Sequence, residues 1–133
     1  MTKGILCTID FSEASKEALR WSVSLAETLH SHLTILYTYR LFNSTGGDAS
    51  DLKKRIESEA NQQFSGFEKE LLTGKKISYD FKVEVGFISN RVKDFSKKHE
   101  LGFLVVGDRK RANNHETIED LVKEIQVPLV ILP

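Results

Sequence analysis

The sequence lacks several features that would place it in a class at once. It has a single cysteine, which excludes an internal disulfide, and its 19 basic and 19 acidic side chains give a formal net charge of +0. A neutral chain argues against the broad basic surface of a nucleic-acid or peripheral membrane protein. No apolar run approaches the ~20 residues of a membrane helix, and the N-terminus does not resemble a signal peptide. We therefore expect a cytoplasmic protein without nucleic-acid or membrane partners.

The length and apolar content of the chain predict one globular domain. The chain has 133 residues, of which 40% are apolar. A chain of this size buries roughly two-thirds of its unfolded surface, which is enough for a core without disulfides or metal. The lone Cys7 lies in the apolar run 5–9, so it is expected to be a small buried hydrophobe and not a reactive thiol. We expect residues 1–133 to form a single domain.

Five short segments have the composition of β-strands. The clearest is 101–107, an unbroken apolar run that Gly107 closes. A strand with no polar face is typical of a parallel sheet that helices cover on both faces. Residues 77–85 instead alternate apolar and polar side chains, which favours an edge strand with one wet face. The other predicted strands are 4–10, 33–39 and 128–132.

Four segments between the strands show helical spacing of apolar residues. Ser12 is placed to cap the first helix, with Glu13 in its first turn. Its predicted inward face is Ala14, Ala18, Trp21, Leu25 and Leu29. The second helix, 51–72 before Gly74, has the stripe Leu52, Ile56, Ala60, Phe64, Phe67 and Leu71. The third begins near Ser89 with Val92 and Phe95 inward, and the fourth carries Ile118, Leu121, Val122 and Ile125.

One helix separates each strand from the next along the whole chain. This order requires right-handed crossovers and predicts an α/β fold with a doubly wound parallel sheet and helices on both faces. Ligands of such sheets lie beyond the carboxyl ends of the strands, where the strand order reverses. The segment 107–111, which holds Gly107, Arg109 and Lys110, is therefore at the expected site.

Three stretches, 5–12, 104–109 and 127–132, resemble the universal stress protein family. In that family the first strand ends in an aspartate followed shortly by serine, as at Asp10 and Ser12. The fourth strand ends in Val-Val-Gly with a basic residue close behind, and the last strand follows a proline, as at Pro128. The resemblance implies a five-stranded Rossmann-like sheet, of the adenine-nucleotide alpha-hydrolase kind, in the order 3-2-1-4-5. That order brings Asp10 and Gly107 to one crevice.

The family divides into members that hold ATP and members that do not. The ATP-holding pattern is Gly, two residues, Gly, nine residues, Gly, then Ser or Thr, because glycines let backbone N–H groups close on the phosphates. Gly107 matches the first position, but Lys110 stands at the second. Counting forward from Lys110 or back from Pro128 finds no glycine at the third. The resemblance therefore implies a member of the kind that lacks the ATP-binding glycine loop, with no cofactor.

Six residues are candidates for nucleotide binding, if any occurs: Asp10, Thr38, Tyr39, Gly107, Arg109 and Lys110. Asp10 also fits a purely structural role, as a residue that forms the turn and caps the following helix. Residues 109–111 would suit either an anion site or a solvated basic loop. The four histidines, His30, His32, His99 and His115, show no metal-ligand spacing, and no catalytic motif is present. We expect no metal and no enzymatic activity.

Three functional hypotheses remain. The first is a dimeric cytoplasmic stress-response protein that binds no ATP and acts through contacts with an unknown protein. The second is an adenine-nucleotide binder, of ATP or AMP, or a weak ATPase with a degenerate phosphate loop. The third is an unrelated flavodoxin-like binding domain, although Gly86 and Pro133 stand where a response-regulator receiver needs aspartate and lysine.

The last strand is the predicted dimer interface. It is apolar, yet the implied strand order puts it at a sheet edge, where an apolar strand is a template for pairing. The resemblance implies that two copies meet there antiparallel about a two-fold axis. The residues expected at this interface are Val127, Leu129, Val130 and Ile131.

Overall fold

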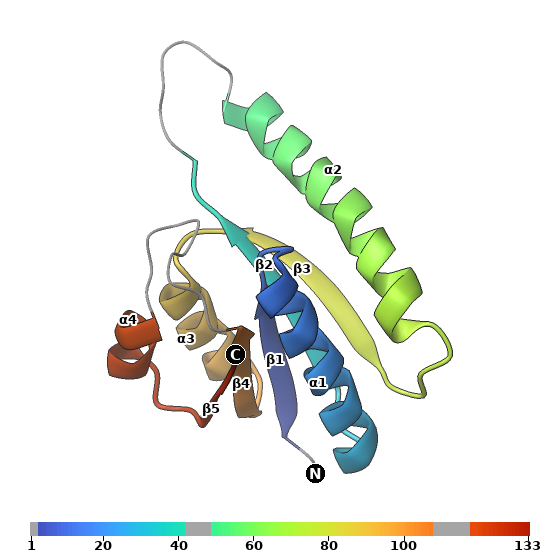
Figure 1. The fold of residues 1–133 in the computed structure, drawn as a ribbon. Coiled ribbons are helices and arrows are strands. Elements are labelled where there is room, and N and C mark those ends of the chain that lie inside the picture. Colours follow the sequence, from blue (N-terminus) through green and yellow to red (C-terminus); the bar gives the residue numbers. More distant parts are fainter. Residues whose placement is uncertain (1–2, 42–48, 108–117) are drawn as a thin grey trace.

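The computed structural model describes residues 3–41, 49–107 and 118–133. Strands and helices alternate along these residues (Figure 1). The elements are β1 (Gly4–Ile9), α1 (Glu13–Leu29), β2 (Leu33–Tyr39), α2 (Ala49–Phe67), the π-helical turn η1 (Glu68–Leu72), β3 (Tyr79–Val85), α3 (Ile88–Lys98), β4 (Leu101–Gly107), α4 (Ile118–Glu124) and β5 (Leu129–Leu132). All four strand pairings are parallel, in the order β3-β2-β1-β4-β5. The predicted fold class and strand order are confirmed.

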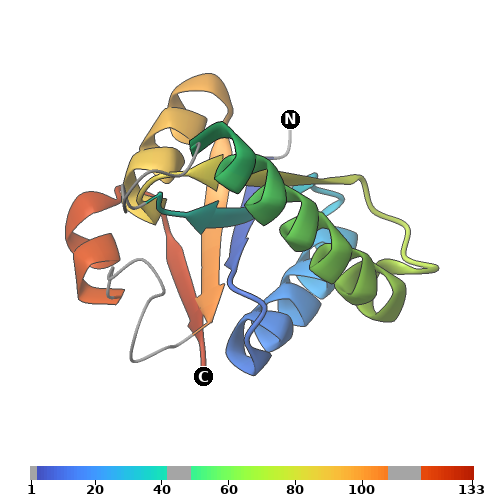
Figure 2. The ribbon, with the colours of Figure 1, turned by 90° about the horizontal axis from the view of Figure 1, so that it is seen from above.

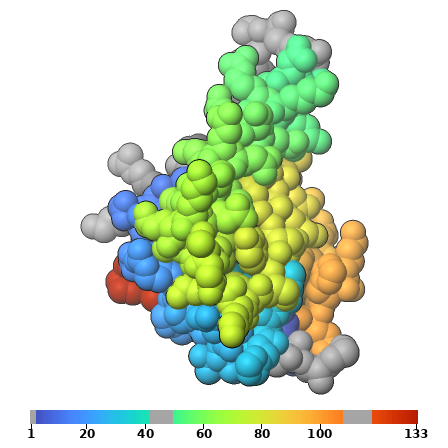
Figure 3. Space-filling model, turned by 90° about the vertical axis from the view of Figure 1, so that its right-hand side faces the viewer, coloured from blue at the N-terminus to red at the C-terminus, as the bar shows by residue number. Residues whose placement is uncertain are grey.

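Helices cover both faces of this sheet. Figure 2 shows α1 and α2 on one face and α3 and α4 on the other. Each face has its own apolar core, because successive side chains of a strand point to opposite faces. In β1, Ile5, Cys7 and Ile9 join the core under α1 and α2, whereas Leu6 joins the core under α3 and α4. Figure 3 shows the edge strand β3 between α2 and α3.

The inward face of α1 differs from the prediction. Trp21 and Leu29, predicted to face the core, are each 37% exposed. Ala18 is buried as predicted, and the other buried residues of the helix are Ser15, Leu19, Ser22, Val23 and Ala26. Small residues suit a helix that packs closely on the sheet, and the buried Ser22 hydroxyl is satisfied by donating to the carbonyl of Ala18 at 2.8 Å. Counting only apolar residues therefore missed the serines of this face.

The stripe of α2 is buried only in its second half. Ala60, Phe64 and Leu71 lie in the core as predicted, but Leu52 is 36% exposed. The start of α2 projects beyond the end of the sheet in Figure 1. The predicted helix also changes type near its end, where one π-helical turn lets the consecutive Leu71 and Leu72 both reach the core.

Smaller differences concern the second half of the chain. Strand β4 is fully buried only from Leu104 to its end, so the prediction of an entirely buried strand was wrong for its first three residues. On α4, Leu121 is buried, but Val122 is 59% exposed, contrary to the prediction. Because α4 ends at Glu124, Ile125 lies beyond the helix, although it still packs on the core.

The lone cysteine is buried as expected. Cys7 is a free thiol in the core under α1, and burial raises the pKa of its thiol to about 12. Among the described residues, none of the helices combines the length and apolarity that crossing a bilayer requires.

Candidate functional site

The strand order of the sheet reverses between β1 and β4. These strands pair in parallel up to Cys7 and Val105, two residues before the ends of the strands at Ile9 and Gly107. Asp10, which follows β1 directly, therefore lies beside Gly107 at the carboxyl edge of the sheet. We call this place the crevice. It is where ligands of doubly wound sheets bind.

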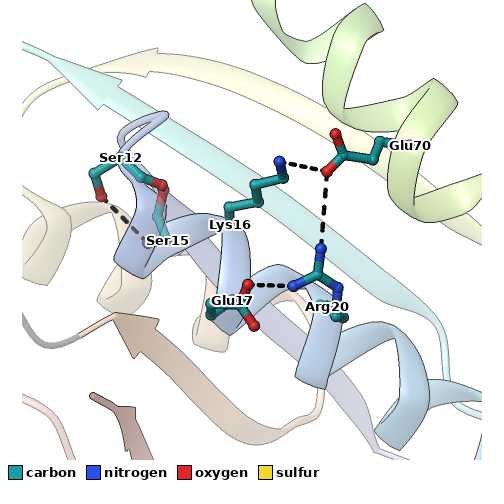
Figure 4. A network of polar contacts seen from close by, with 6 residues as sticks. All are labelled: Ser12, Ser15, Lys16, Glu17, Arg20 and Glu70. Carbon is teal, nitrogen blue, oxygen red and sulfur yellow. Dashed lines mark hydrogen bonds and ion pairs between the residues drawn. The ribbon is translucent and has the colours of Figure 1, made fainter.

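Asp10 holds the turn between β1 and α1. One of its carboxylate oxygens, Oδ1, accepts a hydrogen bond from the backbone N–H of Ser12 at 3.0 Å and another from the Ser12 hydroxyl. Its own N–H donates to the Ser15 hydroxyl at 3.3 Å. The Ser12 oxygen in turn caps α1 by accepting from the N–H of Ser15 at 3.2 Å (Figure 4). Asp10 thus has the turn-and-cap role at the carboxyl end of β1.

An aromatic cluster adjoins the same turn, and the sequence analysis did not find it. Phe11 has a φ of 63°, which bulky residues rarely adopt, and its ring lies 5.1 Å from that of Tyr37 and 5.4 Å from that of Phe67. Phe64 and Phe81 stack at 4.1 Å in the same region. Packing against this cluster holds Phe11 in its unusual conformation. The signal in the sequence was Phe11 itself, an apolar residue in a turn.

Gly107 packs tightly on α1. A β-carbon at this residue would lie 2.7 Å from the carbonyl carbon and oxygen of Ala14 and 2.9 Å from the nitrogen of Ser15. These distances are far below van der Waals contact, so only glycine fits here without moving the helix. The glycine is therefore required by packing, whether or not a ligand approaches it.

Two hydrogen bonds fix Tyr39 at the end of β2. The Tyr39 side chain is directed to α2, where its hydroxyl donates to Glu57 at 3.1 Å, and burial together with Glu57 raises the pKa of Tyr39 to about 12. The Tyr39 carbonyl accepts from the N–H of Gly86 at 2.8 Å. Thr38, pointing to the opposite face, is half-buried in register with Glu84 of β3. The structure thus places Asp10 beside Gly107 and directs the Tyr39 side chain to α2.

Two cations in the first half of α1, Lys16 and Arg20, both form ion pairs with acidic side chains. Lys16 pairs with Glu70, and Arg20 pairs with Glu17 and lies 3.8 Å from Glu70 (Figure 4). The hydrogen bond from Lys16 to Glu70 raises the pKa of Lys16. These pairs tie α1 to the turn after α2, so both cations already have acidic partners.

The remaining nucleotide candidates, Arg109 and Lys110, lie outside the described residues, as does the rest of 108–117. The sequence still limits what this loop offers, since Gly107 is the last glycine of the chain. Within the described ranges, no three His, Cys, Asp or Glu side chains gather into a group that could hold a metal ion.

The predicted dimer residues lie at or next to β5, the edge strand opposite β3. In the described structure β5 pairs with β4 and ends the strand order. Ile131 is 41% exposed, and Val127, Leu129 and Val130 are each partly exposed. The strand therefore presents an apolar edge.

Several solved structures share the fold of this chain. A solved structure of the universal stress protein UspA from Lactobacillus plantarum has a TM-score of 0.81 at 19% identity, over 98% of this chain and 97% of that one. The universal stress protein from Archaeoglobus fulgidus in complex with dAMP has a TM-score of 0.71 at 14% identity, over 99% and 98% of the two chains. A universal stress protein in complex with cAMP has a TM-score of 0.65 at 14% identity, over 98% and 95%.

At these identities the solved structures establish the fold alone, and no curated protein sequence matches the chain. The family is established by sequence: the profile of the Universal stress protein family matches residues 1–133. This chain belongs to the universal stress protein family.

Proposed function

We propose that this protein is a homodimeric, cytoplasmic stress-response protein that acts through contacts with another protein and does not use ATP. One observation carries the proposal. Gly107, the single glycine that matches the ATP-holding pattern, is required by its packing on Ala14, and no glycine follows it in the chain. A loop that closes on a triphosphate needs several backbone N–H groups at positions without a β-carbon.

The loss of such a loop weakens binding strongly. Each charge-assisted hydrogen bond to a phosphate contributes roughly 1.5–3 kcal/mol, so losing two or three removes several orders of magnitude in affinity. A lysine at position 110 supplies a point charge for a phosphate, which returns only part of this binding energy. No group with a catalytic role is assigned to the crevice, and we propose no enzymatic activity.

The dimer is proposed on β5. An exposed apolar outer strand pairs readily with a second copy, and Pro128 and Pro133 confine that pairing to the four residues between them. Antiparallel pairing about a two-fold axis would bring Val130 and Ile131 of both copies together and cover them.

A second candidate function is binding of an adenosine monophosphate. The relatives in complex with dAMP and cAMP favour it, since both ligands carry a single phosphate. In this chain, the Asp10 carboxylate at the crevice supports contact with an adenosine. Without a glycine-rich loop, a monophosphate loses less binding energy than ATP does.

Native mass spectrometry of the purified protein tests both proposals. We expect the mass of a dimer without retained ATP. A dimer that retains a mononucleotide would support the second candidate over the first. A monomer, or a protein that retains ATP, would contradict the proposal.

A further inference from the structure

A second cavity lies at the opposite, amino-terminal edge of the sheet from the crevice. It has a volume of about 570 Å³, within the usual range of small-molecule sites. Its walls come from the starts of β1, β2 and β3 and from the end of α3. The lining residues are Gly4, His32, Thr34, Asp80, Lys82, Phe95, Lys98, His99 and Glu100.

The cavity is polar because of the strand pattern of β3. Tyr79 and Phe81 point to the core under α2, which leaves Asp80 and Lys82 on the face toward α3. In register with Asp80 stands Thr34 of β2, whose buried hydroxyl donates to Asp80 Oδ1 at 2.9 Å. An apolar core cannot close over this part of the sheet, so the space stays open.

The carboxylate of Asp80 already has hydrogen-bonding partners within the protein. Asp80 Oδ1 lies 2.7 Å from Nε2 of His32 in addition to its bond from Thr34. The other ring nitrogen of His32 lies 2.9 Å from the Ser78 hydroxyl. These contacts from His32 and Thr34 fix the Asp80 carboxylate on the strand side of the cavity.

The lysines of this region, in contrast, have no acidic partner. An adjoining hollow of about 380 Å³ shares Lys98, His99 and Glu100 with the cavity and adds Lys3 and Lys97. The two hollows together carry four lysines, with Lys82 as the fourth, against two carboxylates. Among the described residues none of these lysines forms an ion pair, unlike Lys16 and Arg20 on α1. In the cavity itself Lys82 and Lys98 balance Asp80 and Glu100, and the excess of positive charge comes from Lys3 and Lys97 of the adjoining hollow.

Two aromatic rings also line the cavity. The rings of Phe95 and His99 stack at 4.5 Å on the last turns of α3. The Lys82 ammonium, reaching across from β3, lies 5.7 Å from the centre of the Phe95 ring. The helix C-terminus explains cations at Lys97 and Lys98. The helix C-terminus does not explain Lys82, because this residue lies on β3 and lines the same cavity.

We propose that this cavity binds a small organic phosphate, with Lys82 and Lys98 holding the phosphate and Phe95 and His99 contacting a flat apolar part of the molecule. Lysine suits this role as a point charge for phosphate oxygens. The site is independent of the crevice and of the function proposed above, since no residue is shared between them.

The same cluster does not form a hydrolytic centre. Ser78, His32 and Asp80 have the residue types of a catalytic triad, but Ser78 does not line the cavity. A molecule bound between Lys82 and Lys98 would not meet its hydroxyl. Ser78 and Asp80 together fix the orientation of the His32 ring.

Phenyl phosphate is the probe for the test, because it combines a phosphate with a flat ring. Titrated into the full-length ¹⁵N-labelled protein, it should give saturable amide shifts at low-millimolar concentrations, centred on Gly4, Lys82 and His99. The double variant Lys82→Gln, Lys98→Gln should weaken the binding by roughly tenfold or more. Inorganic phosphate, which lacks the ring, should bind the wild type more weakly than phenyl phosphate.

The matched control is Lys53→Gln, Lys54→Gln on the exposed face of α2, which removes the same charge. It should leave the affinity within twofold. Equal weakening in both double variants would show a general charge effect and overturn the proposal. Unsaturable shifts, shifts centred on Asp10 and Gly107, or equal affinity for inorganic phosphate would also overturn it.

Discussion

Gly107 at the end of β4 lies directly against the backbone of Ala14 in the first turn of α1, where a β-carbon would stand 2.7 Å from the Ala14 carbonyl. This contact brings the two sides of the crevice together. Packing alone is therefore enough to explain why residue 107 is glycine. A glycine at this position therefore does not distinguish a nucleotide-binding member from one that binds none.

The contact predicts that Gly107→Ala destabilises the protein by about 1–3 kcal/mol, as overpacking of a tight site does. Urea unfolding measures the loss. Gly66→Ala is the control, because a β-carbon there meets nothing within 4 Å and alanine favours the helix, so stability should rise by about 0.5–1 kcal/mol. Equal stability of Gly107→Ala and wild type would show that α1 shifts freely and that the contact is unimportant.

The cap of α1 gives a second prediction. Ser12→Ala removes the acceptor for the N–H of Ser15 and should lower the free energy of unfolding by about 1 kcal/mol. Thr28→Ala, on the exposed side of the same helix, should be neutral or slightly stabilising, since alanine is the better helix former. Thermal or urea unfolding of the two variants makes the comparison. If Ser12→Ala leaves the free energy of unfolding unchanged, the Ser12 cap does not stabilise the helix as described.

Much of the fold was predictable from the sequence because its signals are local. The apolar run that ends at Gly107 and the cap at Ser12 each indicated an element that the structure contains. The face of α1 was not predictable in this way. Ser15 and Ser22 are buried because the helix lies close to the sheet, and that closeness is a tertiary property.

The buried thiol gives a prediction for pH. An unfolded chain releases the Cys7 proton near the ordinary pKa of 9.0, whereas burial raises the pKa of the folded state to about 12. Between these values the unfolded state binds fewer protons, so stability must fall as pH rises. The slope reaches at most about 1.4 kcal/mol per pH unit.

Urea unfolding between pH 9 and 10 tests this slope, and the contribution of Tyr39, whose ordinary pKa is 10.0, is the same in wild type and variant. Cys7→Ala should be less stable at every pH, because it leaves a cavity, yet its stability should fall less steeply with pH than that of wild type. Parallel slopes for the two proteins would show that the thiol does not titrate as described.

The proposed dimer predicts the effect of a charge on β5. Ile131→Lys places an ammonium at the apolar edge and should shift the protein to monomer in light scattering at tens of micromolar. Val122→Lys makes the same substitution at an exposed site on α4, which the proposal leaves outside the interface, and should remain dimeric. A wild type that is monomeric, or an Ile131→Lys variant that stays dimeric, would contradict pairing through this strand.

The candidate site was predictable only in part. The resemblance implied that Asp10 and Gly107 meet, and the adjacent strands β1 and β4 place them together. The direction of Tyr39 toward Glu57 could not be read from spacing, because it depends on where α2 crosses the sheet. The cavity at Lys82 was also missed, since its walls come from four elements whose charged residues resemble ordinary solvated faces.

Isothermal titration with ATP, AMP and adenosine tests the central claim most directly. The crevice retains Asp10 beside Gly107 but has no further glycine to wrap a triphosphate. ATP should therefore show no binding in the micromolar range, and any affinity for AMP or adenosine should equal or exceed that for ATP. Micromolar binding of ATP that is tighter than binding of AMP would contradict the account.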